Sequence, residues 1–163
     1  MTQFTPAQIE EQASQLLKKY PGLEFPVNVI HIANNLGYEC KIFHGDAKMK
    51  NISGVVDYDN KQININDSES PCRKRFTIAH EIGHIILHPG ENRIDFRTQP
   101  SDRPFDVKEF EANEFAGCLL MPRDIFSQKY LHSSFLKEVC DFFGVSEQAL
   151  LVRADRLGLA KNG

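Results

Sequence analysis

His80, Glu81 and His84 are the residues of this chain whose types and spacing most clearly suggest chemistry. On a helix, side chains four positions apart lie on the same side, so both imidazoles could bind one metal ion. Glu81 would project beside that ion, within reach of a bound water but not easily of the metal itself. A bound zinc lowers the pKa of such a water to about 7, and a carboxylate can then take its proton. The trio therefore indicates metal-assisted hydrolysis.

The residues around this trio are apolar on almost every side of the expected helix, which Ser70 and Pro71 would cap and which continues to His88. A helix that is apolar nearly all round is a buried helix. Burying two histidines and a glutamate is costly unless they are paired or bound to a metal. The alternative is a core helix whose histidines only form hydrogen bonds, and it explains the pattern less well. We therefore interpret the stretch as the H-E-x-x-H motif of zinc peptidases.

A catalytic zinc ion normally takes three protein ligands, with water in the fourth position. His88 continues the spacing of the two histidines, but it lies about 12 Å from His80 along the helix axis. That separation is too large for one ion. The longer metzincin motif would need glycine and histidine where this chain has Leu87 and Gly90, so it does not fit. The third ligand must therefore come from another element.

The helix predicted over residues 107–120 offers three glutamates. At about 100° per residue, Glu109 falls on the margin of the inward apolar face, whereas Glu111 lies on the flank and Glu114 points away. A surface cluster of charges would account for Glu111 and Glu114 but poorly for Glu109. Asn113 lies one turn after Glu109, where it could hydrogen-bond a ligand histidine. We expect Glu109 to be the third ligand, with Glu111 in reserve.

Length and composition are those of a single globular domain. The chain has 163 residues and a formal net charge of −3, so no broad attraction to nucleic acid or to an anionic membrane is expected. No signal peptide or membrane-spanning segment is predicted. The cysteines are scattered without a C-x-x-C pair, which favours a reducing cytoplasm over a disulfide framework. They are Cys40, Cys72, Cys118 and Cys140.

The order of patterns predicts an α+β fold, in which a small twisted antiparallel or mixed sheet packs on the H-E-x-x-H helix and on the glutamate-bearing helix. We expect an N-terminal helix within residues 1–24, a catalytic core over 25–122 and a C-terminal helical extension over 123–163. The expected helices span 6–20, 26–36, 71–88, 107–120, 122–130, 135–143 and 146–157, and the expected strands span 38–43, 52–58 and 62–66.

Three local expectations accompany this fold. In the helix over 26–36, Val29, Ile30, Ala33 and Leu36 should face inward. Asp59 and Asn60 should form a two-residue turn between the last two strands, and residues 89–106 should be an irregular loop. One strand of this hairpin should border the cleft and offer an unpaired edge to an extended peptide.

Two stretches of the sequence together resemble the ImmA/IrrE metallopeptidases. They run from Arg75 to His88 and from Glu109 to Pro122, and the similarity extends over roughly residues 24–158. The resemblance implies a gluzincin-like (zincin-like) fold. It also implies that zinc is held by His80, His84 and the first glutamate of an E-x-x-x-N pattern, which is Glu109.

In that family, endopeptidases cleave helix-turn-helix repressor proteins at specific sites and so act as antirepressors. The longer members carry further domains that this sequence does not show, so we expect a separately encoded repressor as the substrate. Glu81 would be the general base. A further group should stabilise the oxyanion, and Tyr130, His132 and the arginines within residues 93–103 are equal candidates.

Two other functions compete with this interpretation. One is an antirepressor that inactivates its partner by binding alone and uses zinc only structurally. The other is a zinc hydrolase that acts on a non-peptide amide. A binding protein would have no need of Glu81, so the intact motif favours the enzyme.

Residues 136–153 have the outline of a helix-turn-helix, with the turn at Gly144. The would-be recognition helix from Ser146 carries almost no excess of positive charge, because Glu147 and Asp155 offset Arg153 and Arg156. Phosphate contacts supply most non-specific affinity for DNA, so we expect this region to pack or to dock substrate rather than to bind DNA.

Overall fold

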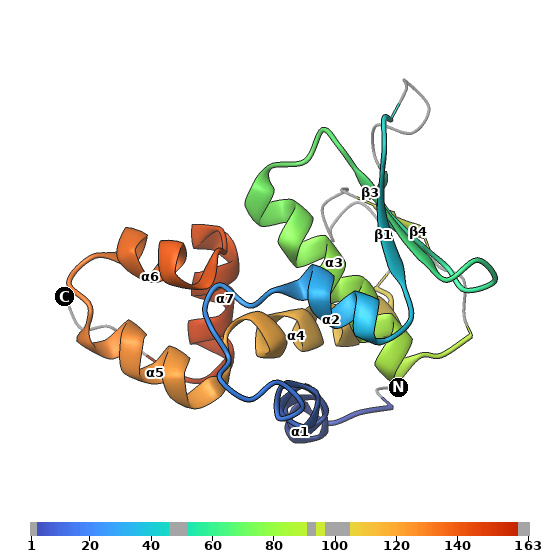
Figure 1. Cartoon of the computed structure of the whole chain (residues 1–163). Helices are drawn as coiled ribbons and strands as arrows, with labels where there is room; N and C mark the ends of the chain where they lie inside the picture. Colours follow the sequence, from blue (N-terminus) through green and yellow to red (C-terminus); the bar gives the residue numbers. More distant parts are fainter. Residues whose placement is uncertain (1–2, 46–51, 91–93, 97–104, 160–163) are drawn as a thin grey trace.

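The protein folds as a mixed β-sheet at one end and a group of helices that extends away from it (Figure 1). This computed structural model describes residues 3–45, 52–90, 94–96 and 105–159. The sheet contains four strands in the order β1-β3-β2-β4, in which β1 is parallel to β3 and β2 is antiparallel to both of its neighbours. The strands are β1 (Glu39–Phe43), β2 (Ile52–Asp57), β3 (Gln62–Asn66) and β4 (Ile94–Phe96).

The helix α3 (Pro71–Leu87) lies between the sheet and α4 (Val107–Leu120), packed on one side against β2 and β3 and on another against α4. The α+β prediction is therefore confirmed, as is the packing of the sheet on α3. The expected packing of the sheet on α4 is wrong for the described residues, because α4 packs mainly against α3 and α1. The remaining helices are α1 (Pro6–Leu17), α2 (Val29–Asn35), α5 (Arg123–His132), α6 (Leu136–Phe143) and α7 (Glu147–Arg156).

Side-chain caps define where the two central helices begin. The Ser70 hydroxyl accepts a hydrogen bond from the Arg73 amide at 3.2 Å, and Pro71 occupies the first turn of α3. The Asp106 carboxylate accepts from the amides of Lys108 and Glu109 at 2.9 and 3.3 Å, which starts α4. These caps fix the first turn of each helix and so set where the residues further along each helix lie.

The helix α2 begins later than expected. It starts at Val29 rather than at residue 26, because the Asn28 side chain accepts the His31 amide and serves as the N-cap. The expected inward position of Ile30 is wrong, since its side chain is 49% exposed and Ile32 is buried instead.

The hairpin of β2 and β3 is confirmed, and Ile63 and Ile65 are buried on its core face as the alternating pattern predicts. Its connection is longer than the expected two residues. It covers residues 58–61, with the Asn60 amide bonded to Asp57 Oδ1 at 3.1 Å and Lys61 at a φ of 55°. Long polar runs between strands permit several turn lengths, so the sequence did not determine this one.

The segment 89–106 is not wholly irregular, because β4 forms within it and pairs with β2. Gly54 of β2 lies opposite Asp95 of β4. Each hairpin strand thus has a neighbour on both sides, and the expected unpaired edge on the hairpin is absent in the described sheet. The outer strands are β1 and β4.

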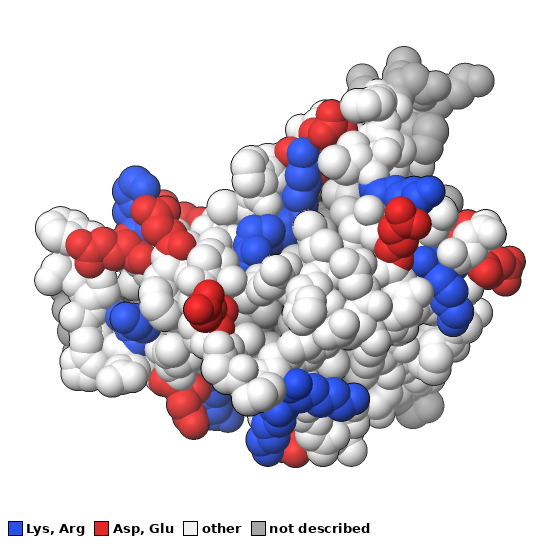
Figure 2. All heavy atoms as spheres, viewed as in Figure 1, with Lys and Arg blue, Asp and Glu red and all other residues white. Residues whose placement is uncertain are grey.

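The helices α6 and α7 are joined at Gly144, which has a φ of 65°. Arg153 of α7 is buried, donating to the Met121 carbonyl oxygen at 3.0 Å and to the Glu10 carboxylate at 2.9 Å. This arginine holds α7 against α1 and is not available to a phosphate. On the described part of the face in Figure 2, basic and acidic side chains alternate without a broad patch of one sign.

Within the described ranges, no helix combines the length and apolar character needed to cross a membrane. All four cysteines are free thiols.

Candidate metal centre

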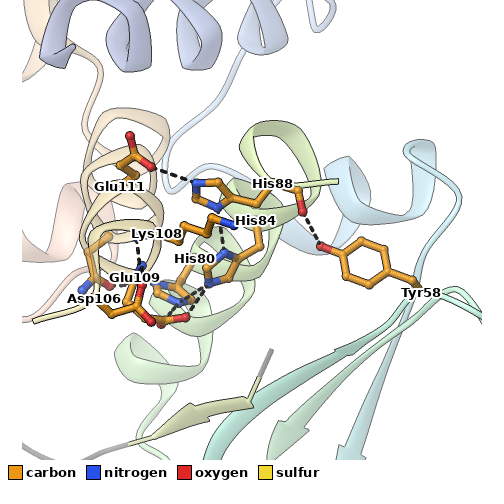
Figure 3. A network of polar contacts seen from close by, with 9 residues as sticks. Tyr58, His80, His84, His88, Asp106, Lys108, Glu109 and Glu111 are labelled. Carbon is orange, nitrogen blue, oxygen red and sulfur yellow. Dashed lines mark hydrogen bonds and ion pairs between the residues drawn. The ribbon is translucent and has the colours of Figure 1, made fainter. Parts of the chain in front are cut away.

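The side chains of His80, His84 and Glu109 converge on one point between α3 and α4 (Figure 3). The Nε2 atoms of the two histidines are 3.1 Å apart. One carboxylate oxygen of Glu109 lies 3.0 Å from His80 Nε2, and the other lies 3.0 Å from His84 Nε2. The three residues that the sequence nominated as ligands are therefore brought together by the fold.

This arrangement fits a zinc ion in both chemistry and size. Two imidazole nitrogens and one carboxylate form a donor set found in catalytic zinc sites. Ligand atoms about 2.0–2.1 Å from a tetrahedral zinc lie roughly 3.3 Å from one another, close to the separations of 3.0–3.1 Å observed here. Among the described residues, this is the one group of three or more histidine, cysteine and acidic side chains whose donor atoms converge.

Asn113 orients the first histidine. Its Oδ1 lies 2.7 Å from His80 Nδ1. Since an amide oxygen can only accept, this ring nitrogen carries the proton and donates the hydrogen bond. The Nε2 atom of His80 is then left with its lone pair toward Glu109 and His84. The expected role of Asn113 beside a ligand histidine agrees with this geometry.

Burial and hydrogen bonding set the charge states at the centre. Burial lowers the pKa of His84 below its usual range, although the hydrogen bond with Glu109 opposes this effect. Burial would raise the pKa of Glu109, but hydrogen bonds and charge interactions with His80 and His84 outweigh it and hold that pKa well below its usual range. A carboxylate beside a neutral imidazole is the combination that binds a metal cation.

Glu81 is fully buried where α3 faces β2. A methyl group added to Gly54 of β2 would lie 3.5 Å from Glu81 Oε1 and 2.6 Å from Thr77 Cγ2. The strand can therefore approach this face of α3 only with glycine at position 54. A strand of the predicted hairpin therefore packs beside Glu81, and its position at a substrate cleft stays a prediction.

Glu111 differs from its expected place on the flank of α4. It is fully buried, and its Oε1 lies 3.0 Å from His88 Nε2 rather than in the group of converging donors. The assignment as a reserve ligand or a surface charge is therefore wrong in this structure. The sequence signal that was missed is His88 itself, one helical turn after His84 and in need of a buried partner.

Of the candidates for oxyanion stabilisation, the two that the structure describes, Tyr130 and His132, do not join the cluster. Tyr130 is buried and stacks on Phe126 of its own helix, and His132 borders a surface hollow between α5 and α6. In Figure 1, α5 lies on the opposite side of α4 from the sheet. Arg93, Arg97 and Arg103 lie outside the described residues.

Comparisons with known proteins identify relatives of this chain. The profile of the IrrE N-terminal-like peptidase domain matches residues 37–155. The chain is 33% identical over 134 residues to immunity region protein 2 of Bacillus phage phi105, covering 78% of this chain and 76% of that protein. It is 31% identical over 105 residues to the radiation response metalloprotease IrrE of Deinococcus radiodurans, covering 63% of this chain but 29% of that protein.

A solved structure shares the fold. A transcriptional regulator of Mycobacterium tuberculosis superposes with a TM-score of 0.65 over 96% of this chain and 48% of that protein, at 15% identity. The chain thus spans about half of that regulator and less than a third of the Deinococcus protein. The domain match and the phage relative carry the assignment: the chain belongs to the ImmA/IrrE family of metallopeptidases.

Proposed function

We propose that the protein is a zinc-dependent endopeptidase that cleaves a helix-turn-helix repressor at a specific site. His80, His84 and Glu109 would hold the zinc ion, and Glu81 would be the general base. The observation that carries this proposal is the convergence of the three donor atoms between two buried helices, with Glu81 on the same helix as both histidines. Membership of a metallopeptidase family supports it.

Zinc bound at this position would act as a Lewis acid toward water and toward the scissile carbonyl. Glu81 would take a proton from the attacking water on a carboxylate oxygen and then give it to the nitrogen of the leaving amine. Its burial beside β2 would restrict bulk water around the transferred proton. Asn113 would keep the His80 ring in the tautomer that the site requires.

The sheet suggests how a peptide would be held. Gly54 lies beside Glu81 on one side and opposite Asp95 of β4 on the other. β4 is an outer strand, so an extended substrate could add to its edge by backbone hydrogen bonds and pass close to the metal centre. We therefore expect cleavage within an extended or locally unfolded segment of the partner rather than within a stable helix.

A repressor substrate is supported by the family and by the names of the relatives. One relative belongs to a phage immunity region, and another is a metalloprotease of the radiation response. Neither name describes a general digestive protease. Cleavage of a transcriptional repressor would place this protein in the cytoplasm.

The test is incubation of the purified protein and zinc with purified candidate repressors, followed by intact-mass measurement of the products. We expect one discrete cut with the wild-type protein and none with Glu81→Gln. An antirepressor that works by binding alone would inactivate its partner without a mass change, and Glu81→Gln would do so equally well. That result would show that the protein acts by binding its partner and not by cleaving it.

A further inference from the structure

A second group of buried polar contacts leads away from His84 toward the N-terminus. His84 Nδ1 lies 3.0 Å from His88 Nδ1, and His88 Nε2 lies 3.0 Å from Glu111 Oε1. His88 is 3% exposed and Glu111 is fully buried. Figure 3 shows the His88 ring between His84 and Glu111. The peptidase mechanism described above uses neither His88 nor Glu111.

The N-terminal segment forms the outer end of this series. Glu111 Oε2 accepts hydrogen bonds from the backbone amides of Gln3 and Phe4, at 3.1 and 2.8 Å. The Phe4 ring makes an edge contact with the His88 ring, at 6.2 Å between centroids. The Tyr58 hydroxyl donates to the His88 carbonyl oxygen at 3.4 Å. The carboxylate and the imidazole are therefore held from several elements at once.

The directions of these hydrogen bonds follow from where each proton can sit. To bind a metal, His84 must present an unprotonated Nε2, so its proton is on Nδ1, and this N–H donates a hydrogen bond to His88 Nδ1. His88 Nδ1 is then an acceptor, and the proton of this ring is on Nε2. Glu111 as a carboxylate can only accept, so its Oε1 accepts a hydrogen bond from the N–H of His88 Nε2. Every group in the series is satisfied in this one direction.

We propose that His88 and Glu111 are positioning residues that fix the tautomer and the ring orientation of His84 for metal binding, with the N-terminal segment as the anchor of Glu111. The inference rests on the proposed metal site. It makes the two histidines unequal, since Asn113 serves His80 directly whereas His84 depends on a two-residue relay that ends at residues 3 and 4.

Glu111→Gln tests the relay with almost no change of shape. The amide oxygen of glutamine must accept from the Gln3 and Phe4 amides, so its NH2 group faces His88 Nε2. That nitrogen then has to accept, which moves the His88 proton to Nδ1 and the His84 proton to Nε2. The proton would thus occupy the atom that should bind the metal. Glu114→Gln is the matched control, because Glu114 is on the same helix but pairs with Arg156 at 2.8 Å.

The measurement is zinc affinity by competition with a chelator, with the melting temperature of each metal-free variant as a check on folding. We expect Glu111→Gln to weaken zinc binding roughly 10- to 100-fold, as losses of partners behind ligand histidines usually do. Glu114→Gln should match the wild type. Nitrogen-15 spectra of the zinc-loaded wild type should show His88 protonated on Nε2, a signature that a purely structural role would not require.

Two results would overturn the relay while leaving the metal site intact. One is a zinc affinity of Glu111→Gln that lies within about twofold of the zinc affinity of Glu114→Gln. That difference is far smaller than the loss expected when a partner of a ligand histidine is removed. The other is a His88 ring protonated on Nδ1 in the zinc-loaded wild type. A wild-type protein that binds no zinc would instead remove both the proposed function and the relay that depends on it. Should Glu111→Gln melt far below the wild type, the His88 spectrum of the wild type still decides the inference.

Discussion

Gly83 of α3 lies so close to Ala112 of α4 that a methyl group at Gly83 would be 3.1 Å from the Ala112 carbonyl oxygen and 3.2 Å from its Cα. Both neighbours are backbone atoms, which cannot move aside by rotation of a side chain. Gly83 directly precedes His84, and Ala112 directly precedes Asn113. The close approach of the two helices thus occurs beside His84, a proposed metal ligand, and Asn113, which contacts the proposed ligand His80.

Gly83→Ala should therefore separate α3 from α4 and weaken both stability and zinc binding. We expect a loss of about 1–3 kcal/mol in the free energy of unfolding, as for other overpacked interiors, together with lower zinc affinity. Gly117→Ala is the control, because a methyl group there would meet only Arg153 Cδ at 3.8 Å. Thermal unfolding and chelator competition on both variants measure the difference. Equal behaviour of the two variants would show that the close helix contact is not needed.

Glu81→Gln should keep the metal and lose the activity. The converging donor atoms come from His80, His84 and Glu109, so removing the charge of Glu81 leaves them in place. General acid–base groups typically contribute about 10²- to 10⁴-fold to rate, and we expect a loss in this range or larger. Metal analysis by mass spectrometry alongside a cleavage assay separates the two effects. Loss of zinc from this variant would make Glu81 a ligand instead of a base.

Glu109→Ala should reduce zinc binding severely, whereas Glu114→Ala should not. Glu109 is within 3.0 Å of both histidine Nε2 atoms, while Glu114 pairs with Arg156. In crystals of the wild type soaked with zinc, anomalous scattering should place one ion at about 2.0–2.2 Å from all three ligands. An ion between His88 and Glu111 would contradict this assignment, as would undiminished zinc binding by Glu109→Ala.

Arg153→Ala should lower the free energy of unfolding, and the variant, like the wild type, should not bind DNA. The buried guanidinium bonds to Met121 and Glu10, and the Glu10 side chain is 22% exposed, so water can partly compensate its lost partner. We expect a cost on the order of 2 kcal/mol. Arg156→Ala, at a more exposed ion pair, should cost less than about 1 kcal/mol.

A mobility-shift assay with duplex DNA at low salt should show no complex for the wild type or for either variant. The account of α7 as a packing element would fail if the wild type bound DNA tightly and Arg153→Ala removed that binding without loss of stability.

The sequence pointed to side chains that the fold brings together, His80, His84 and Glu109, because their geometry is local or periodic. The spacing of His80 and His84 places both imidazoles on one side of a single helix, and Glu109 and Asn113 share one side of α4 in the same way. Helical periodicity at that level needs no knowledge of the tertiary structure. The convergence of the two helices was inferred from the number of ligands that zinc requires.

The features that the sequence did not predict depend on contacts between distant segments. Glu111 is buried because the amides of Gln3 and Phe4, more than a hundred residues earlier, meet its carboxylate. β4 is a strand because β2 offers it a backbone partner, although its three residues are too few to show a periodic pattern. The burial of Ile32 in place of Ile30 is a separate case, because Ile32 lies on the same helical face as Val29 and Ala33 whereas Ile30 lies off that face.

The central claim is that this chain hydrolyses peptide bonds of a regulatory protein through Glu81. It is tested most directly by comparing new protein N-termini in host cells that produce either the wild type or Glu81→Gln at equal abundance and equal zinc content. We predict one or very few new N-termini that appear only with the wild type and that map to an extended segment of a helix-turn-helix repressor. Identical sets of N-termini in the two strains would contradict the claim.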